Sequence, residues 1–133
     1  EISCSLVGSE MCIRDSARVR YSTIENWSKN MYNLNTKRAT VAEGGTIEWV
    51  SGSFGSHTGC LYPMSVLQGE GARMEFTGIT FAGAGQDLDT GAKVVHAAPN
   101  TTSRSGIWCL TAWCNTSASM VCIHTRTDDS YED

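Results

Sequence analysis

The fold is decided by the stretch Glu43-Gly44-Gly45-Thr46-Ile47-Glu48-Trp49, which returns 27 residues later as Glu70-Gly71-Ala72-Arg73-Met74-Glu75-Phe76. In both copies a turn that contains glycine leads into a short run with apolar residues at alternate positions, the pattern of a half-buried β-strand. A third run, Gly91-Ala92-Lys93-Val94-Val95-His96, echoes the pattern about 20 residues further on. The sequence therefore predicts a repeated strand-turn-strand unit of about 20 to 27 residues.

Each unit is too short to bury its apolar face alone. Stacked units cover one another, so the repeat predicts an all-β fold of the parallel β-solenoid, or β-helix, type. The content of 13 Gly and 8% aromatic residues also favours short strands joined by tight turns. A β-sandwich of short strands at similar spacing is the alternative architecture.

Length and charge exclude several classes of protein. A chain of 133 residues has room for one domain, and its formal charge of −4 argues against the basic surface of a nucleic-acid-binding protein. No apolar run is long enough to span a membrane, and the first residues lack the cationic and apolar regions of a signal peptide. We therefore expect a soluble protein with neither nucleic acid nor membrane as a partner.

The six cysteines are unevenly spaced, with none between Cys12 and Cys60. This spacing favours reduced thiols over a disulfide framework. The even number of cysteines, three sequons and the Gly-rich units keep a second hypothesis open, an extracellular β-solenoid module that binds or acts on carbohydrate.

The two ends differ from the middle of the chain. Residues 1–16 show neither alternation nor a helical period, and they resemble a peptide that arises when a sequencing adapter is translated, so we interpret them as a non-native leader. Residues 104–133 are rich in Cys and Trp and end in an acidic run, a divergent tail that a frameshift would produce. We expect irregular ends that do not pack into the solenoid.

The middle of the chain, residues 17–103, resembles the SufB/SufD family of iron–sulfur cluster assembly scaffolds. The motifs that carry the resemblance are Arg18-Val-Arg-Tyr-Ser-Thr-Ile-Glu-Asn-Trp27, the Glu43 to Trp49 segment, Tyr62-Pro63, Leu67-Gln68-Gly69-Glu70-Gly71, Asp89-Thr90-Gly91-Ala92-Lys93 and His96-Ala97-Ala98-Pro99-Asn100-Thr101.

The resemblance implies a right-handed parallel β-helix fragment of a non-enzymatic scaffold. It implies partners as well, namely a SufC-type ATPase, a SufD-type paralogue and sulfur donor proteins, in a reducing cytoplasm or plastid. The cofactor of the parent family is an iron–sulfur cluster. We expect this fragment itself to bind none.

Cys60 is the one thiol in residues 17–103, and it is the candidate for handling sulfur, because a thiolate accepts sulfane sulfur and ligates iron. Some members of the family carry a cysteine just after the Tyr-Pro pair, where this chain has Ser65. The tail offers an alternative metal site of Cys109, Cys114, Cys122 and His124. Its spacing matches no standard zinc or iron–sulfur motif, so we expect no metal there.

Three further residues receive structural interpretations. His96 lies on a predicted strand, where we expect a core histidine that stacks between coils. Glu48 and Glu75 alternate with apolar residues, so both should point to the solvent face and form no acid–base pair. The sequence therefore disfavours a polysaccharide-cleaving β-helix.

Overall fold

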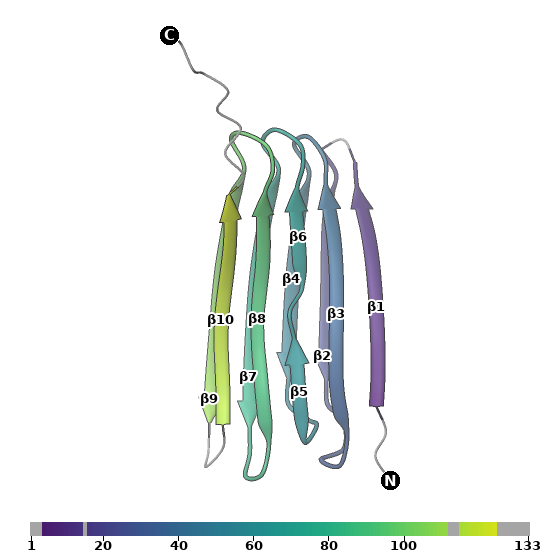
Figure 1. Ribbon diagram of the computed structural model, residues 1–133, viewed down its shortest axis with the longest axis vertical. Coiled ribbons are helices and arrows are strands. Elements are labelled where there is room, and N and C mark those ends of the chain that lie inside the picture. Colours follow the sequence, from purple (N-terminus) through teal and green to yellow (C-terminus); the bar gives the residue numbers. More distant parts are fainter. Residues whose placement is uncertain (1–3, 15, 112–114, 125–133) are drawn as a thin grey trace.

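The computed structural model describes residues 4–14, 16–111 and 115–124 and shows a flattened β-solenoid of about four turns (Figure 1). No helix occurs among these residues. The strands are β1 (Cys4–Ile13), β2 (Arg18–Glu25), β3 (Tyr32–Val41), β4 (Thr46–Ser53), β5 (Thr58–Leu61), β6 (Met64–Leu67), β7 (Arg73–Ala82), β8 (Asp87–His96), β9 (Thr102–Thr111) and β10 (Asn115–His124).

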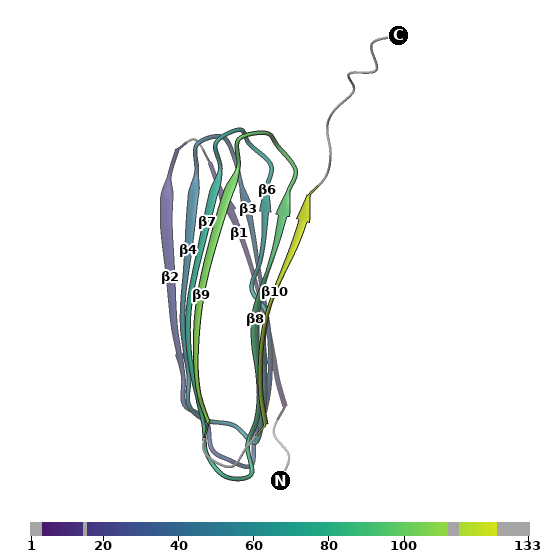
Figure 2. The same cartoon turned by 90° about the vertical axis from the view of Figure 1, so that its left-hand side faces the viewer.

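The strands form two sheets that face each other across a narrow lumen (Figure 2). The first sheet has the order β1-β3-β5-β8-β10, with β6 also between β3 and β8, and the second has the order β2-β4-β7-β9. Every described pairing is parallel. The chain alternates between the two sheets, so each coil adds one layer to each sheet. The solenoid prediction is confirmed, and the antiparallel β-sandwich is excluded.

The register confirms the main repeat and corrects its echo. Thr46 pairs with Arg73 at the predicted spacing of 27 residues, and Arg73 pairs in turn with Thr102 in β9. The run from Gly91 to His96 belongs to β8 in the opposite sheet, so its interpretation as a third copy was wrong. Both strands of a coil alternate apolar and polar residues. Alternation alone therefore does not distinguish a repeat of one full coil from a repeat of half a coil.

One corner of the solenoid has the same backbone conformation in four successive coils. Ser16, Gly44, Gly71 and Asn100 lie just before the strands of the second sheet, and all have positive φ, between 55° and 70°. The corners stack, since the backbone N–H of Gly44 donates to the carbonyl of Glu70 at 2.9 Å. A left-handed turn residue is easiest for Gly and next for Asn, which explains the turn before each repeat.

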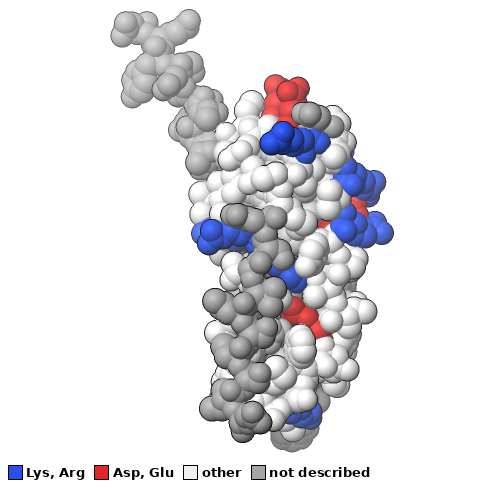
Figure 3. Space-filling view, turned by 90° about the vertical axis from the view of Figure 1, so that its right-hand side faces the viewer, with Lys and Arg blue, Asp and Glu red and all other residues white. Residues whose placement is uncertain are grey.

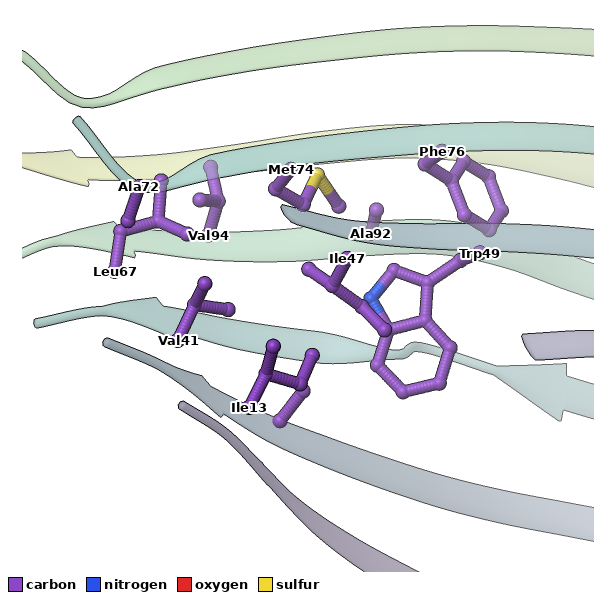
Figure 4. Close-up of a cluster of buried hydrophobic side chains, with 11 residues drawn as sticks. Ile13, Val41, Ile47, Trp49, Leu67, Ala72, Met74, Phe76, Ala92 and Val94 are labelled. Atoms are coloured by element: carbon purple, nitrogen blue, oxygen red, sulfur yellow. The ribbon is translucent and has the colours of Figure 1, made fainter. Parts of the chain in front are cut away.

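The apolar core lies between the sheets at the end where the second sheet's strands begin (Figure 4). Ile47 and Trp49 from β4 meet Met74 and Phe76 from β7, as the alternation predicts. The cluster also contains Ile13, Ala39, Val41, Leu67, Ala72, Ala92 and Val94. Apolar surface shared by successive coils supplies most of the driving force that no single unit could provide.

The structure differs from the expectation of irregular ends. Residues Cys4–Ile13 form β1 and pair with β3 over their whole length, and Ile13 is buried in the core. Thr102–Thr111 and Asn115–His124 likewise continue the sheets as β9 and β10. The edge of a parallel sheet offers unpaired N–H and C=O groups, and these extended segments satisfy them. The rest of the two ends, residues 1–3, 112–114 and 125–133, lies outside the described residues.

The packing of the core predicts that alanine substitutions at two neighbouring positions of β7 differ strongly in their effect on the free energy of unfolding. Phe76→Ala should lower the free energy of unfolding by about 3–5 kcal/mol, because a fully buried ring leaves a cavity that closes only partly. Thr77→Ala, on the exposed side of the same strand, should cost less than about 1 kcal/mol. Urea unfolding followed by circular dichroism measures both, and similar losses would show that the lumen is not a packed core.

Candidate functional site

Cys60, the predicted sulfur-handling residue, is half-buried in β5 and pairs with Asp89 of β8. Burial raises the pKa of the Cys60 thiol, and the nearby carboxylate of Asp89 raises it further. The hydroxyl of Tyr62 donates to Oδ1 of Asp89 at 2.6 Å and holds that carboxylate in place. The surroundings therefore favour the thiol over the nucleophilic thiolate.

Ser65 lies at the position where some members of the family that the sequence resembles carry a cysteine. In this chain it has a structural role. Its side chain is fully buried and its Oγ accepts a hydrogen bond from Nε1 of Trp49 at 2.9 Å. This bond satisfies the one polar atom of a large core side chain.

The alternative metal site of the tail is only partly within the described residues. Cys114 and the side chain of His124 lie outside them, which leaves Cys109 in β9 and Cys122 in β10. Both thiols are free and exposed. The part of the chain that the structure describes contains no group of three or more His, Cys, Asp or Glu side chains that could hold a metal ion.

Cys109 and Cys122 also lie at different heights in the solenoid. Cys109 pairs with Thr80, whose hydroxyl lies 3.1 Å from that of Thr90 in the facing sheet. Cys122 pairs with Val94, four residues beyond Thr90. At about 3.3 Å per residue this separates the two cysteines by roughly 13 Å along the strands, too far for a shared ion.

His96 is a buried core histidine, as predicted. Its Nδ1 lies 2.8 Å from Oγ1 of Thr101, and its Nε2 lies 3.1 Å from Oγ of Ser103. Both ring nitrogens are thus engaged with hydroxyl groups of the following turn and strand, where the ring connects two coils.

Sequence reasoning missed a polar cluster inside the lumen, at the end opposite to the apolar core. The carboxylate of Glu25 accepts hydrogen bonds from Nδ2 of Asn33 at 2.6 Å and from Nδ2 of Asn35 at 2.7 Å. Nζ of Lys37 donates to Oγ1 of Thr23 at 2.7 Å and lies 3.8 Å from Glu25. The cluster thus holds a buried ion pair with nearly complete hydrogen bonding.

The sequence of β3 alternates as expected of a strand, but its polar residues face the interior and its apolar residue faces solvent. In β3 the lumen positions are Asn33, Asn35 and Lys37, while Leu34 between them is exposed. Alternation reports two faces without saying which is inside, and the apolar residue of such a strand is normally assigned to the core. The three polar residues at alternate positions were the available signal.

Burial lowers the pKa of Lys37, and the attraction of Glu25 opposes this shift. The ammonium group also lies 5.0 Å from the centre of the Tyr21 ring. Two buried polar atoms near the cluster, Oδ1 of Asn35 and Oγ of Ser51, have no hydrogen-bond partner. A small cavity of about 10 Å³ in the lumen, lined in part by Glu25, has the room of one water molecule.

Glu48 and Glu75 both lie on the outer face of the second sheet and pair in the register, but their surroundings differ. Glu75 is exposed, as predicted. Glu48 is covered, because Arg18 and Arg20 of β2 both bind its carboxylate, Arg20 with a hydrogen bond of 2.6 Å. These two hydrogen bonds lower the pKa of Glu48. Because the two arginines leave Glu48 only 4% exposed, its expected solvent exposure was wrong.

Charged side chains elsewhere form small groups of mixed sign. On the face that carries β1, Figure 3 shows basic and acidic groups next to one another and no extended basic area among the described residues. The described residues also contain no helix that could span a membrane.

The environment of Cys60 predicts an effect of its neighbour on thiol reactivity. Asp89→Asn should make alkylation of Cys60 near neutral pH roughly two- to fivefold faster, because removing the negative charge lowers the thiol pKa while Asn keeps an acceptor for Tyr62. Mass spectrometry after iodoacetamide pulses measures the rate at this residue. Asp87→Asn, two residues earlier, is the matched control, and an equal acceleration there would contradict the assignment.

Lys37 predicts a pH dependence of stability. Because its folded pKa is lowered, the unfolded chain binds more protons as pH rises from the folded pKa toward about 10.4, so stability increases over that range. Lys37→Met should abolish this increase, measured as the difference in urea unfolding free energy between the two proteins from pH 7 to 10. Lys29→Met, at an exposed lysine, is the control, and a flat difference for Lys37→Met would contradict the prediction.

Comparison with known proteins assigns the chain to a family. The family model for the SUF system FeS cluster assembly SufBD core domain matches residues 3–109. Iron–sulfur cluster assembly SufBD family proteins of Staphylococcus saprophyticus, Staphylococcus aureus and Staphylococcus epidermidis are 52% identical over 94 residues, which is 71% of this chain and 20% of each relative. The chain thus spans about a fifth of the length of these curated relatives. No solved structure matches it. With a solenoid fold and a match over most of its length, the chain belongs to the SufBD core family of the SUF iron–sulfur cluster assembly system.

Proposed function

We propose that the chain is part of a non-enzymatic scaffold on which iron–sulfur clusters are built and from which they are transferred, together with a SufC-type ATPase and a second SufBD-type chain. The observation that carries the proposal is the match of the SufBD core model to residues 3–109, the span of β1 to most of β9. Stacked parallel coils form a rigid rod, which suits a part that positions other components.

The reactivity and spacing of the described thiols favour a structural role for this segment over cluster binding by the segment alone. Cys60 is the candidate for handling sulfur, yet its raised pKa keeps the reactive thiolate scarce. Cys109 and Cys122 lie too far apart to share an ion. We propose that this chain alone holds no stable cluster and that sulfur donors and further ligands come from other parts of the assembly.

The proposed setting is a reducing compartment, the cytoplasm or a plastid, without nucleic acid or membrane as partner. Six free thiols in a titration under denaturing, non-reducing conditions would support this setting. Disulfides would support the extracellular solenoid module instead.

The scaffold role can be tested in cells that lack their own SufBD proteins. The complete gene should restore the activity of iron–sulfur enzymes, and its product should co-purify with a SufC-type ATPase. The Phe76→Ala variant should reduce both through loss of the folded core, whereas Thr77→Ala should reduce neither. A wild-type product that accumulates normally but restores no activity and binds no ATPase would overturn the proposal.

The isolated 133-residue chain allows a separate test of the thiols. Anaerobic incubation with iron and sulfide, followed by visible absorbance, should show no stoichiometric cluster. A cluster that is lost in the Cys60→Ser variant would identify Cys60 as a ligand. Loss in Cys109→Ser or Cys122→Ser would identify a ligand in the tail, residues 104–133.

A further inference from the structure

A groove of about 280 Å³ lies on the outer face of the second sheet, over β7 and β9. The register places Glu75 of β7 beside Arg104 of β9 and Thr77 beside Gly106, and Trp108 follows two residues after Gly106. These five residues of two successive coils line the groove, which we call the outer groove. Small-molecule sites in proteins begin at about 300 Å³, so the outer groove has the size for one small ring.

Trp108 supplies a flat apolar surface to the outer groove. Its indole ring lies against Gly106, since a Cβ on Gly106 would be only 3.0 Å from the ring. The missing side chain at Gly106 therefore lets the ring lie along the sheet. Trp108 is nevertheless 57% exposed. An exposed indole of this kind offers a large, rigid contact surface to another ring.

The charged side chains of the outer groove are not engaged with the rest of the chain. Among the described residues, the ion pairs involve only the carboxylates of Glu25 and Glu48. Glu48 lies beside Glu75 in the preceding coil, where two arginines bind it. Glu75 and Arg104, by contrast, are exposed and form no ion pair with a described residue. Their polar atoms can therefore bind a ligand.

The two opposite charges select for a neutral ligand with hydroxyl groups. An anion would be attracted by Arg104 and repelled by Glu75, and a cation would experience the reverse. A hydroxyl group suits both side chains, because its oxygen accepts a hydrogen bond from the guanidinium while its proton is donated to the carboxylate. Two hydroxyls on adjacent carbons also match the planar, two-pronged end of each side chain.

We propose that the outer groove binds a neutral pyranose sugar. The C–H face of the sugar ring packs on Trp108, and adjacent hydroxyls lie between Glu75 and Arg104. This site goes beyond the scaffold role and does not depend on it. Because the groove is open and a hexose has about twelve non-hydrogen atoms, we expect a dissociation constant of roughly 1–10 mM.

Saturation-transfer NMR on the 133-residue chain, with glucose, cellobiose and maltose as probes, tests the proposal. The expected result is transfer to ring C–H protons of at least one of these neutral sugars. Glucose 6-phosphate and glucosamine, which carry opposite charges, should both bind about threefold more weakly than glucose. Trp108→Ala should abolish the transfer, and Glu75→Gln should weaken binding about fivefold through loss of the charged acceptor. Circular dichroism verifies the fold of each variant.

Trp27→Ala is the matched control for the indole, because Trp27 is similarly exposed, at 47%, but lies between β2 and β3. Glu43→Gln, at an exposed carboxylate outside the groove, is the control for the loss of negative charge. Both should leave sugar binding unchanged.

Three outcomes would overturn the proposal. The first is no saturation transfer to any of the neutral sugars. The second is binding that Trp108→Ala weakens no more than Trp27→Ala does. The third is tighter binding of N-acetyl-triglycine amide, a neutral peptide, than of any sugar, which would assign the outer groove to an extended peptide.

Discussion

The hydrogen-bonded register between successive coils is the constraint on which the rest of this structure depends. Each residue lies beside its equivalent 26 to 29 positions along the chain, as Tyr32 beside Thr58 and Thr58 beside Asp87. Parallel pairing allows no slip of one residue without moving every side chain to the other face. The left-handed corners and the shared core are both consequences of that spacing, because it stacks equivalent positions of successive coils on one another.

The lumen that results is divided along its length. At one end Ile47, Met74 and their neighbours form an apolar core that the coils share. At the other end Glu25 and Lys37 are buried as an ion pair with amide partners. A buried pair of this kind adds little net stability, because the cost of desolvation offsets its attraction, but breaking it is expensive. The polar end therefore constrains the arrangement of β2 and β3 more than it stabilises the fold.

The same division bears on the role of the chain in its family. The interior of the solenoid is used for core packing, and the thiol of Cys60 lies where burial and Asp89 raise its pKa. The raised pKa keeps the thiolate of Cys60 scarce near neutral pH.

The sequence alone determined the solenoid, the spacing of 27 residues, the glycine corners and the family, because each depends on local alternation, turn chemistry or direct similarity. The lumen polar cluster, the cover over Glu48 and the packing of both ends were decided only by the tertiary structure. Alternation does not say which face is inside, so Leu34 and its polar neighbours could be placed only once the facing sheet was present. The partners of Glu48 come from the preceding coil, 28 and 30 residues away, and only stacking brings them together. The pairing of β1 with β3 and of β9 with β7 likewise became visible only when the neighbouring strands were in place.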